Sequence, residues 1–204
     1  MNSSRIDENT IEAVQRFHGH MCPGLAIGIR AAEAALQEIG PQARDEEIVA
    51  VVETDMCGVD AIQFLTGCTF GKGNLIHRDY GKNAFSFYRR SDGKGIRLVA
   101  SPDVIPPGDP EREALMAKLR EGTLTGEEQS RFDELQLELC RSILQAPLQS
   151  LFELKEPSGD VPRRARIHSG HICHRCGERA METRTRLYGG EFYCIPCFEE
   201  IERR

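Results

Sequence analysis

The chain has 204 residues, of which 40% are hydrophobic and 28% are charged, as is typical of a globular protein with one or two domains. No segment approaches the ~18 apolar residues of a membrane span, and the first twelve residues are polar and acidic, without the apolar run of a signal peptide. Eight cysteines without a secretion signal indicate the cytoplasm, where thiols stay reduced and serve as ligands or catalysts.

Charge is distributed unevenly along the chain. The first 154 residues hold 16 Lys/Arg against 24 Asp/Glu, a net −8, whereas residues 155–204 hold ten against eight, a net +2. An acidic body argues against broad binding to a phosphate backbone. The run Arg163-Arg164-Ala165-Arg166 could contact an anion or nucleic acid, but such runs are more often solvated linkers. We therefore expect no nucleic-acid partner and no membrane.

Helices come first in the larger part of the chain, and strands follow. A short helix over Ile11–Phe17, capped by Asn9 or Thr10, precedes one from Pro23 to about Ile39, and a third is expected over Val59–Leu65. Strands are expected over Ile48–Val52, Asn74–His77, Ala84–Arg89 and Gly95–Ala100. This order predicts an α+β fold with helices packed on a mixed sheet.

A helical hairpin and a linker follow the strands. After a breaker-rich connection over Pro102 to Pro110, helices are expected over Glu111–Glu121 and Glu127–Leu144, within a hairpin at about 109–145. Thr125 would be the N-cap of the second helix, and Cys140 fits its apolar face as packed core. We expect a core domain over 1–155, a linker over 156–166 and a small domain over 167–204.

Three short segments of the first domain are dense in reactive residues. They are Phe17-His18-Gly19-His20-Met21-Cys22-Pro23-Gly24, Glu53-Thr54-Asp55-Met56-Cys57-Gly58-Val59-Asp60 and Gly67-Cys68-Thr69-Phe70-Gly71-Lys72-Gly73-Asn74-Leu75. Each lies where a strand or loop meets a helix end, which is where ligands commonly bind. A lone buried cysteine is usually a small hydrophobe, but three cysteines and two histidines in three such segments favour a shared metal or thiol site. His77 belongs either to that site or to a strand surface.

Among these residues, Cys22 is a candidate thiolate ligand or nucleophile. Proline at position 23 places Cys22 near a helix N-cap, where free amides and the helix dipole lower a thiol pKa. His18 and His20 both lie within reach of Cys22, and the sequence does not select between them. Gly71-Lys72-Gly73 resembles a phosphate loop only faintly, because it lacks the full spacing and the Ser/Thr after the lysine.

The last forty residues carry a second metal signature. Cys173-His174-Arg175-Cys176 and Cys194-Ile195-Pro196-Cys197 are two Cys-x-x-Cys pairs whose four thiolates can surround one tetrahedral zinc ion. A β-hairpin is expected between them across Gly189-Gly190, and a helix after Cys197. This layout is that of a treble-clef zinc finger. Four cysteines leave no open position on the metal, so this zinc is structural, and disulfides or a redox pair are the weaker alternatives.

The core motifs resemble the FmdE-like family, which takes its name from the E component of formylmethanofuran dehydrogenase. The residues that carry the resemblance are the Phe17 to Gly24 segment with Gly28-Ile29-Arg30, Cys57-x-x-Asp60-x-x-Gln63, and Gly67-Cys68-Thr69-x-Gly71-Lys72-Gly73-Asn74-Leu75. The terminal zinc module is similar to that of the two-domain members. The resemblance implies a thioredoxin-like α+β core with a mixed sheet of about five strands, a treble-clef finger, and a homodimer.

The same resemblance implies a site that binds zinc or another metal in the core. Its implied ligands are His20, Cys22 and Cys57, with Cys68 and His18 nearby. The candidate catalytic residues are Cys22, His20, Cys57, Asp60 and Lys72. The leading hypothesis is a metalloprotein that accompanies or matures a molybdenum or tungsten oxidoreductase. One alternative is a zinc hydrolase or thiol-redox enzyme, with Glu53, Asp55 or Asp60 as the hydrolytic general base. The other is a metal- or redox-sensing adaptor that binds nucleic acid or protein through its finger.

Overall fold

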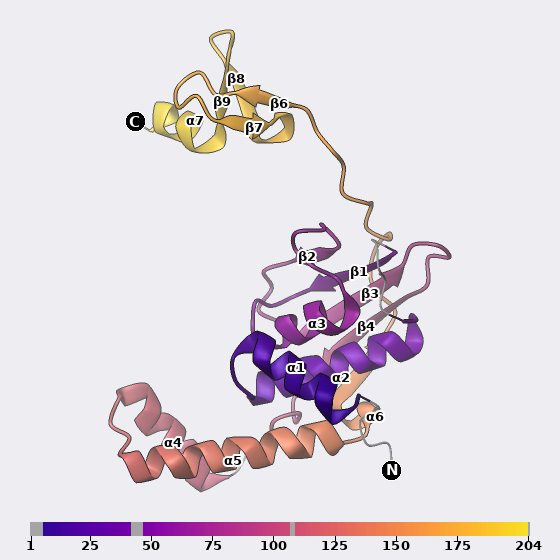
Figure 1. The fold of residues 1–204 in the computed structure, drawn as a ribbon, viewed down its shortest axis with the longest axis vertical. Helices are drawn as coiled ribbons and strands as arrows, with labels where there is room; N and C mark the ends of the chain where they lie inside the picture. Colours follow the sequence, from indigo (N-terminus) through magenta and orange to yellow (C-terminus); the bar gives the residue numbers. More distant parts are fainter. Residues whose placement is uncertain (1–5, 42–46, 107–108, 204) are drawn as a thin grey trace. The chain divides into compact units, whose positions relative to one another are not determined.

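The computed structural model describes residues 6–41, 47–106 and 109–203, so the connection expected over 102–110 lies partly outside it. The chain divides into two compact units, Met1–Arg164 and Ala165–Arg204 (Figure 1). Within the described ranges, no helix has the length and apolarity needed to cross a membrane.

A five-stranded mixed sheet forms the centre of the first unit. Its order is β2 (Leu75–His77), β1 (Ile48–Val52), β3 (Ala84–Arg89), β4 (Gly95–Ala100) and β5 (Phe152–Lys155). Only the β1–β2 pair is parallel, with Val51 opposite Ile76. The other pairs are antiparallel, and Ala50 faces Phe87 across β1 and β3. The α+β class and the mixed sheet flanked by helices are thereby confirmed.

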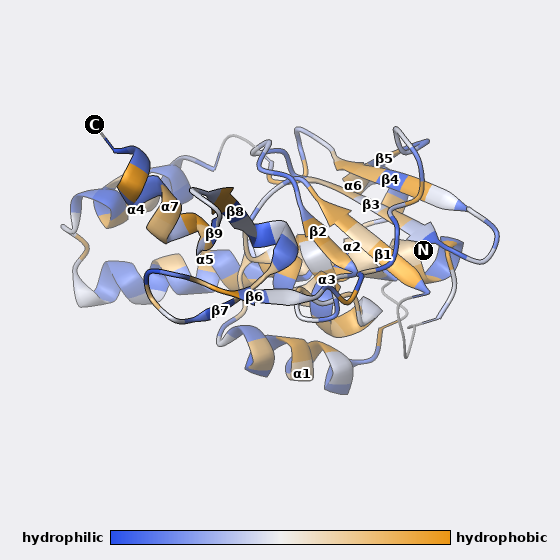
Figure 2. Ribbon diagram, turned by 90° about the horizontal axis from the view of Figure 1, so that it is seen from above, coloured by the Kyte–Doolittle hydropathy of each residue, from blue (hydrophilic) through white to orange (hydrophobic). Residues whose placement is uncertain are grey.

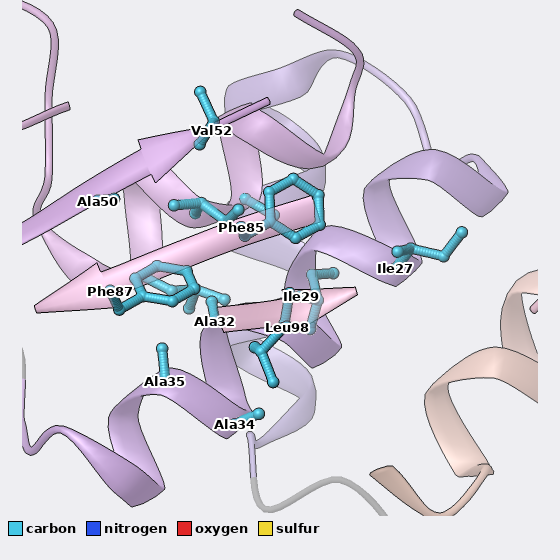
Figure 3. Close-up of a cluster of buried hydrophobic side chains, with 14 of the residues drawn as sticks. Ile27, Ile29, Ala32, Ala34, Ala35, Ala50, Val52, Phe85, Phe87 and Leu98 are labelled. Atoms are coloured by element: carbon cyan, nitrogen blue, oxygen red, sulfur yellow. The ribbon is translucent and has the colours of Figure 1, made fainter. Parts of the chain in front are cut away.

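One face of the sheet carries the hydrophobic core. The helices α1 (Glu8–His18), α2 (Pro23–Glu38) and α3 (Gly58–Thr66) pack there together with part of α5. Alternate strand residues point into this core, including Ala50, Phe85 and Leu98, and they meet the alanine-rich side of α2 (Figure 3). Helix α2 is buried from Leu25 to Ala35. Cys22 stands at the N-terminus of this central helix.

The opposite face of the sheet has a smaller apolar cluster. Val49, Val51 and Tyr88 pack there with Ile76 and with Val161, which follows the last strand. The alternation along β1 explains why its five residues are all buried, because both faces of the strand are covered.

The arm made by α4 (Pro110–Glu121) and α5 (Gly126–Gln145) is inserted between β4 and β5. Thr125 caps α5 in a reciprocal capping box with Glu128, as expected at that threonine. Figure 2 shows much of α5 as hydrophilic, in contrast to the hydrophobic strand β1. At the inner end of α5, Cys140 is 1% exposed and the Arg30 guanidinium donates to the Ala146 carbonyl at 2.7 Å.

One predicted element differs in detail, and two short elements were not predicted. Helix α1 begins earlier than expected, and its N-cap is Asp7, whose carboxylate accepts from the Thr10 amide at 2.9 Å, rather than Asn9 or Thr10. The short α6 (Leu148–Leu151) and the edge strand β5 were not expected from the residue pattern. Their brevity and the charged, exposed residues of β5 give almost no periodic signal.

The second unit is built from short elements. It contains the pair β6 (Gly170–Ile172) and β7 (Arg179–Met181), a 3-10 turn over Glu182–Arg184, the hairpin β8 (Thr185–Tyr188) and β9 (Glu191–Cys194), and α7 (Ile195–Glu202). Gly177 follows the first cysteine pair with φ +75°, a conformation that suits glycine in such a turn.

Candidate metal centre

Three side chains from three elements converge in the core unit. His18 is the last residue of α1, Cys22 is the N-cap of α2 and Cys57 is the N-cap of α3. One ligand atom from each lies within 4.8 Å of the other two. Tetrahedral zinc with these ligands would place their donor atoms about 3.3 to 3.8 Å apart, so modest side-chain movement is enough to close the site.

His18 is oriented for metal binding. Its Nδ1 lies 2.7 Å from Asp60 Oδ2. A carboxylate only accepts, so Nδ1 carries a proton, and in the neutral imidazole Nε2 then keeps its lone pair. That Nε2 is buried and has no hydrogen-bond partner among the described residues. A carboxylate on one ring nitrogen and a metal on the other is the usual arrangement of a histidine ligand.

The environment of Cys22 differs from the prediction in one respect. The Leu25 amide donates to its Sγ at 3.4 Å, as expected at a helix N-cap. Burial nevertheless outweighs this contact and raises the pKa of the Cys22 thiol, and the neighbouring Cys57 raises it further. The helix-end amides act in the expected direction, but the expected net lowering of the Cys22 pKa was wrong because burial has the larger effect. A metal would therefore have to displace a proton from this thiol.

Two glycines allow the cysteine-bearing helices to approach each other. A Cβ atom on Gly28 would lie 2.2 Å from the carbonyl oxygen of Gly58, so α2 and α3 touch backbone to backbone. A Cβ on Gly24 would lie 3.3 Å from Cys57 Cβ. This contact brings the N-termini of both helices together, with Cys22 at one and Cys57 at the other.

The other predicted site residues occupy different positions. The His20 ring lies 4.7 Å from the His18 ring, centroid to centroid, and is exposed. Cys68 is fully buried and its thiol donates to the Ile48 carbonyl at 3.5 Å, so it lies apart from the group of His18, Cys22 and Cys57. Lys72 is on the loop after α3, where its amide donates to Thr69.

The candidate acids are also separated. Glu53 forms two hydrogen bonds with Arg97, at 2.7 and 2.9 Å. Asp60 accepts the hydrogen bond from His18, and Asp55 is exposed. His77, the remaining candidate histidine, is also exposed, at the end of β2. The pairing of Asp60 with His18 was missed by sequence reasoning. The three-residue spacing from Cys57 to Asp60 was the available signal, because residues three apart share a helix face.

A cavity of about 610 Å³ adjoins the candidate centre. Its lining includes His20, Met21 and Cys22 at one end and residues of α4 and α5 at the other. No pattern in the sequence predicted this cavity, because it depends on how the arm folds back beside α2.

The four finger cysteines gather in the second unit, with one sulfur from each within 4.8 Å of the others: Cys173, Cys176, Cys194 and Cys197. The Cys194 amide donates to Cys173 Sγ at 3.3 Å. Backbone N–H groups, that of Cys176 first, lower the pKa of Cys173 to about 6. Contact with the other cysteines, Cys194 first, raises the pKa of Cys197 to about 12, so the four thiols do not ionise alike. Four cysteine sulfurs gathered around one point are the usual ligand set of structural zinc.

Comparison with known proteins agrees with this division. Residues 17–153 match the family model "FmdE, Molybdenum formylmethanofuran dehydrogenase operon", and residues 168–203 match the prokaryotic dksA/traR C4-type zinc finger. A solved structure of a tungsten formylmethanofuran dehydrogenase FmdE-like protein from Syntrophus aciditrophicus aligns over 100% of both chains, with a TM-score of 0.63 and 22% identity. That likeness concerns the fold.

A relative in Archaeoglobus fulgidus is named "Probable S-adenosyl-L-methionine-binding protein". It is 34% identical over 192 residues, which are 90% of this chain and 50% of the relative. The chain thus spans about half the length of this curated relative. Since the first family model covers more than half of the chain and the second covers the finger, the chain belongs to the FmdE family and carries a C-terminal C4-type zinc finger.

Proposed function

We propose that this chain is a cytoplasmic metal-binding protein that accompanies or matures a molybdenum or tungsten oxidoreductase. Its core centre would hold a metal through His18, Cys22 and Cys57, and its finger would serve as a docking element. The observation that carries the core centre is the buried, unpartnered Nε2 of His18, held toward two thiols while Asp60 occupies Nδ1. A buried imidazole nitrogen without a partner is costly unless a ligand satisfies it.

The donor set fits a borderline or soft transition metal. Two thiolates and one imidazole suit zinc, and they also suit iron or copper(I). Three protein ligands leave one position of a tetrahedral ion open, as in catalytic zinc sites, whereas the four-cysteine finger is closed. When bound, the metal would supply a Lewis-acidic position for a water, a substrate or a cofactor sulfur.

Metal content tests the core centre. Protein purified anaerobically should contain about two metals per chain, one in each unit. Cys22→Ser should reduce the content to about one and leave the finger metal in place. Cys68→Ala is the matched control, because Cys68 is buried in the same unit but lies apart from the group. Unchanged metal content in Cys22→Ser would contradict the proposal.

The accessory role and the homodimer need separate tests. For the homodimer, light scattering on purified protein should give twice the chain mass.

For the accessory role, an affinity-tagged chain recovered from its native cells should carry a protein that contains molybdenum or tungsten by elemental analysis. A finger-deleted chain, ending at Arg164, should lose that partner while keeping its core metal. Recovery of the chain alone would contradict the accessory role.

A stand-alone hydrolase is the second candidate, and the observation that favours it is the cavity beside a three-ligand centre. Of the three candidate general bases, Glu53 is paired with Arg97 and Asp60 with His18, which leaves the exposed Asp55. Only this candidate function predicts that purified, metal-loaded protein hydrolyses formyl or amide compounds by itself, with loss of turnover in Asp55→Asn.

S-adenosylmethionine is a further ligand to test, because the Archaeoglobus fulgidus relative is named for binding it. Binding by this chain would mean that the relative's site lies in the half that the two proteins share.

A further inference from the structure

The cavity of about 610 Å³ joins the arm to the candidate metal centre, and nothing in the proposed metal ligation explains it. Its volume lies within the range of small-molecule sites. Cys22 belongs both to its lining and to the group of candidate metal ligands, so the cavity lies next to the centre. Pro23 and Gly24 complete the lining at this end.

The walls of the cavity are mainly apolar. They are formed by Met21 before α2, by Met116 and Leu119 of α4, and by Phe132 and Leu137 of α5. Leu119 and Leu137 are each 42% exposed, so the arm leaves apolar surface uncovered here. Methionine side chains adapt to ligands of different shape. An apolar occupant would remove this surface from water.

The polar groups of the cavity limit the chemistry of the occupant. Arg112 and Asp133 carry opposite charges, and the Arg112 guanidinium already donates to the Pro106 carbonyl at 3.1 Å. A ligand rich in phosphate would therefore meet no surplus of positive charge. Gln136 also lines the cavity, and its buried Oε1 has no hydrogen-bond partner among the described residues. This oxygen can accept from one N–H or O–H group of a ligand.

We propose that this cavity binds a small, largely apolar organic molecule whose head group, a sulfur or oxygen donor, occupies the open position of the metal at His18, Cys22 and Cys57. This inference rests on the proposed metal centre. The arm of α4 and α5 is then the element that selects the ligand, and the core supplies the metal.

A series of n-alkyl thiols, from ethanethiol to octanethiol, tests the cavity in the full chain loaded with Co(II). Thiolate binding at the open position should intensify the sulfur-to-cobalt absorption, while the closed finger site should not respond. Affinity should rise about fourfold per methylene until the cavity is full, as expected when each CH₂ is buried.

Met116→Trp provides the decisive variant, because Met116 lines the cavity on α4 and is not one of the candidate metal ligands. It should abolish the dependence on chain length and leave ethanethiol binding and Co(II) content unchanged. Met181→Trp, at a 57% exposed position in the finger, is the matched control and should behave as the wild type.

The outcomes separate the two levels of the hypothesis. Absence of Co(II) from the core would overturn the proposed centre and this inference with it. Normal Co(II) binding with equal affinity for all thiols would overturn the cavity assignment alone. So would a steep dependence on chain length that survives in Met116→Trp.

Discussion

At the scale of single residues, Asp60 shows how one contact prepares a metal ligand. It accepts from His18 Nδ1 and in turn receives a hydrogen bond from Gln63, at 3.4 Å. Such partners fix the tautomer and orientation of a ligand histidine. Asp60→Ala should therefore lower the affinity of the core for zinc by about 10- to 100-fold, measured by competition with a chromophoric chelator.

The exposed Asp55 supplies the control for this prediction. Asp55→Ala removes the same charge from the neighbouring loop without touching His18, so it should leave zinc affinity nearly unchanged. An equal loss in both variants would show that general electrostatics, rather than orientation of His18, sets the affinity.

Glu53 makes the clearest case for pH-dependent stability. It is 7% exposed and its hydrogen bonds from Arg97 hold the pKa of its carboxyl below the usual 4.5. A lowered folded-state pKa adds stability above pH 4.5, and this stability is lost as pH falls through the lowered value. At pH 7, Glu53→Gln should lower the free energy of unfolding in urea by about 1 to 3 kcal/mol. The difference from wild type should shrink as the pH falls through the lowered pKa of Glu53.

The matched variant for Glu53 lies on the edge strand. Glu153 pairs with Lys155 and its side chain is 66% exposed. Glu153→Gln should change the unfolding free energy by less than about 0.5 kcal/mol at both neutral and strongly acidic pH, because exposed ion pairs contribute little. A loss in Glu53→Gln that is equal at neutral and at strongly acidic pH would contradict the charge-based account.

The sequence allowed the candidate site to be narrowed but not resolved residue by residue. It identified five metal-binding candidates in the core, and the structure groups three of them: His18, Cys22 and Cys57. The choice between His18 and His20 depends on the left-handed turn at Gly19, with φ +101°, which no short pattern specifies. Cys68 could not be set apart, because a thiol buried beside a strand and a ligand thiol look alike in sequence.

At the scale of elements, the contact between α2 and α3 decides the distance between the two cysteines. Gly28→Ala would place a methyl group against the Gly58 backbone and push the helices apart. We expect a loss of about 1 to 3 kcal/mol in stability from overpacking, together with weaker binding of the core metal. Chemical unfolding and zinc competition on the same preparations would measure both.

Gly126 at the start of α5 is the matched position, because a Cβ there meets no atom within 4 Å. Gly126→Ala should be neutral or stabilising by up to about 1 kcal/mol, with unchanged metal affinity. If Gly28→Ala lowered stability while metal affinity stayed at the wild-type value, helix spacing would not control the centre.

Elements with a strong periodic signal were predictable from sequence. The bounds of β1, β3 and β4 agree with the apolar runs at Ile48–Val52, Ala84–Arg89 and Gly95–Ala100. Strand β5 was not predicted from the residue pattern, because Glu153 and Lys155 are charged. Its pairing with β4 depends on the return of the chain along α5. Tertiary contacts, rather than local preference, make that segment a strand.

At the scale of the whole molecule, the two units are stabilised in different ways. The first has a continuous hydrophobic core of strands and helices. In the second, Cys173 is the one buried residue among those described between 165 and 203. A unit of this size without an apolar core depends on its metal, because metal binding supplies the folding free energy.

Selective loss of each metal should therefore affect the two units independently. Cys197→Ser should remove zinc from the finger, and amide hydrogen exchange should then show lost protection in β8 and β9 with unchanged protection in β1 and β3. Cys22→Ser should leave the finger protected, since its own four ligands are intact. Loss of protection in β1 and β3 after Cys197→Ser would mean that the finger stabilises the core, and the finger would then be a structural part of the fold rather than a separable docking element.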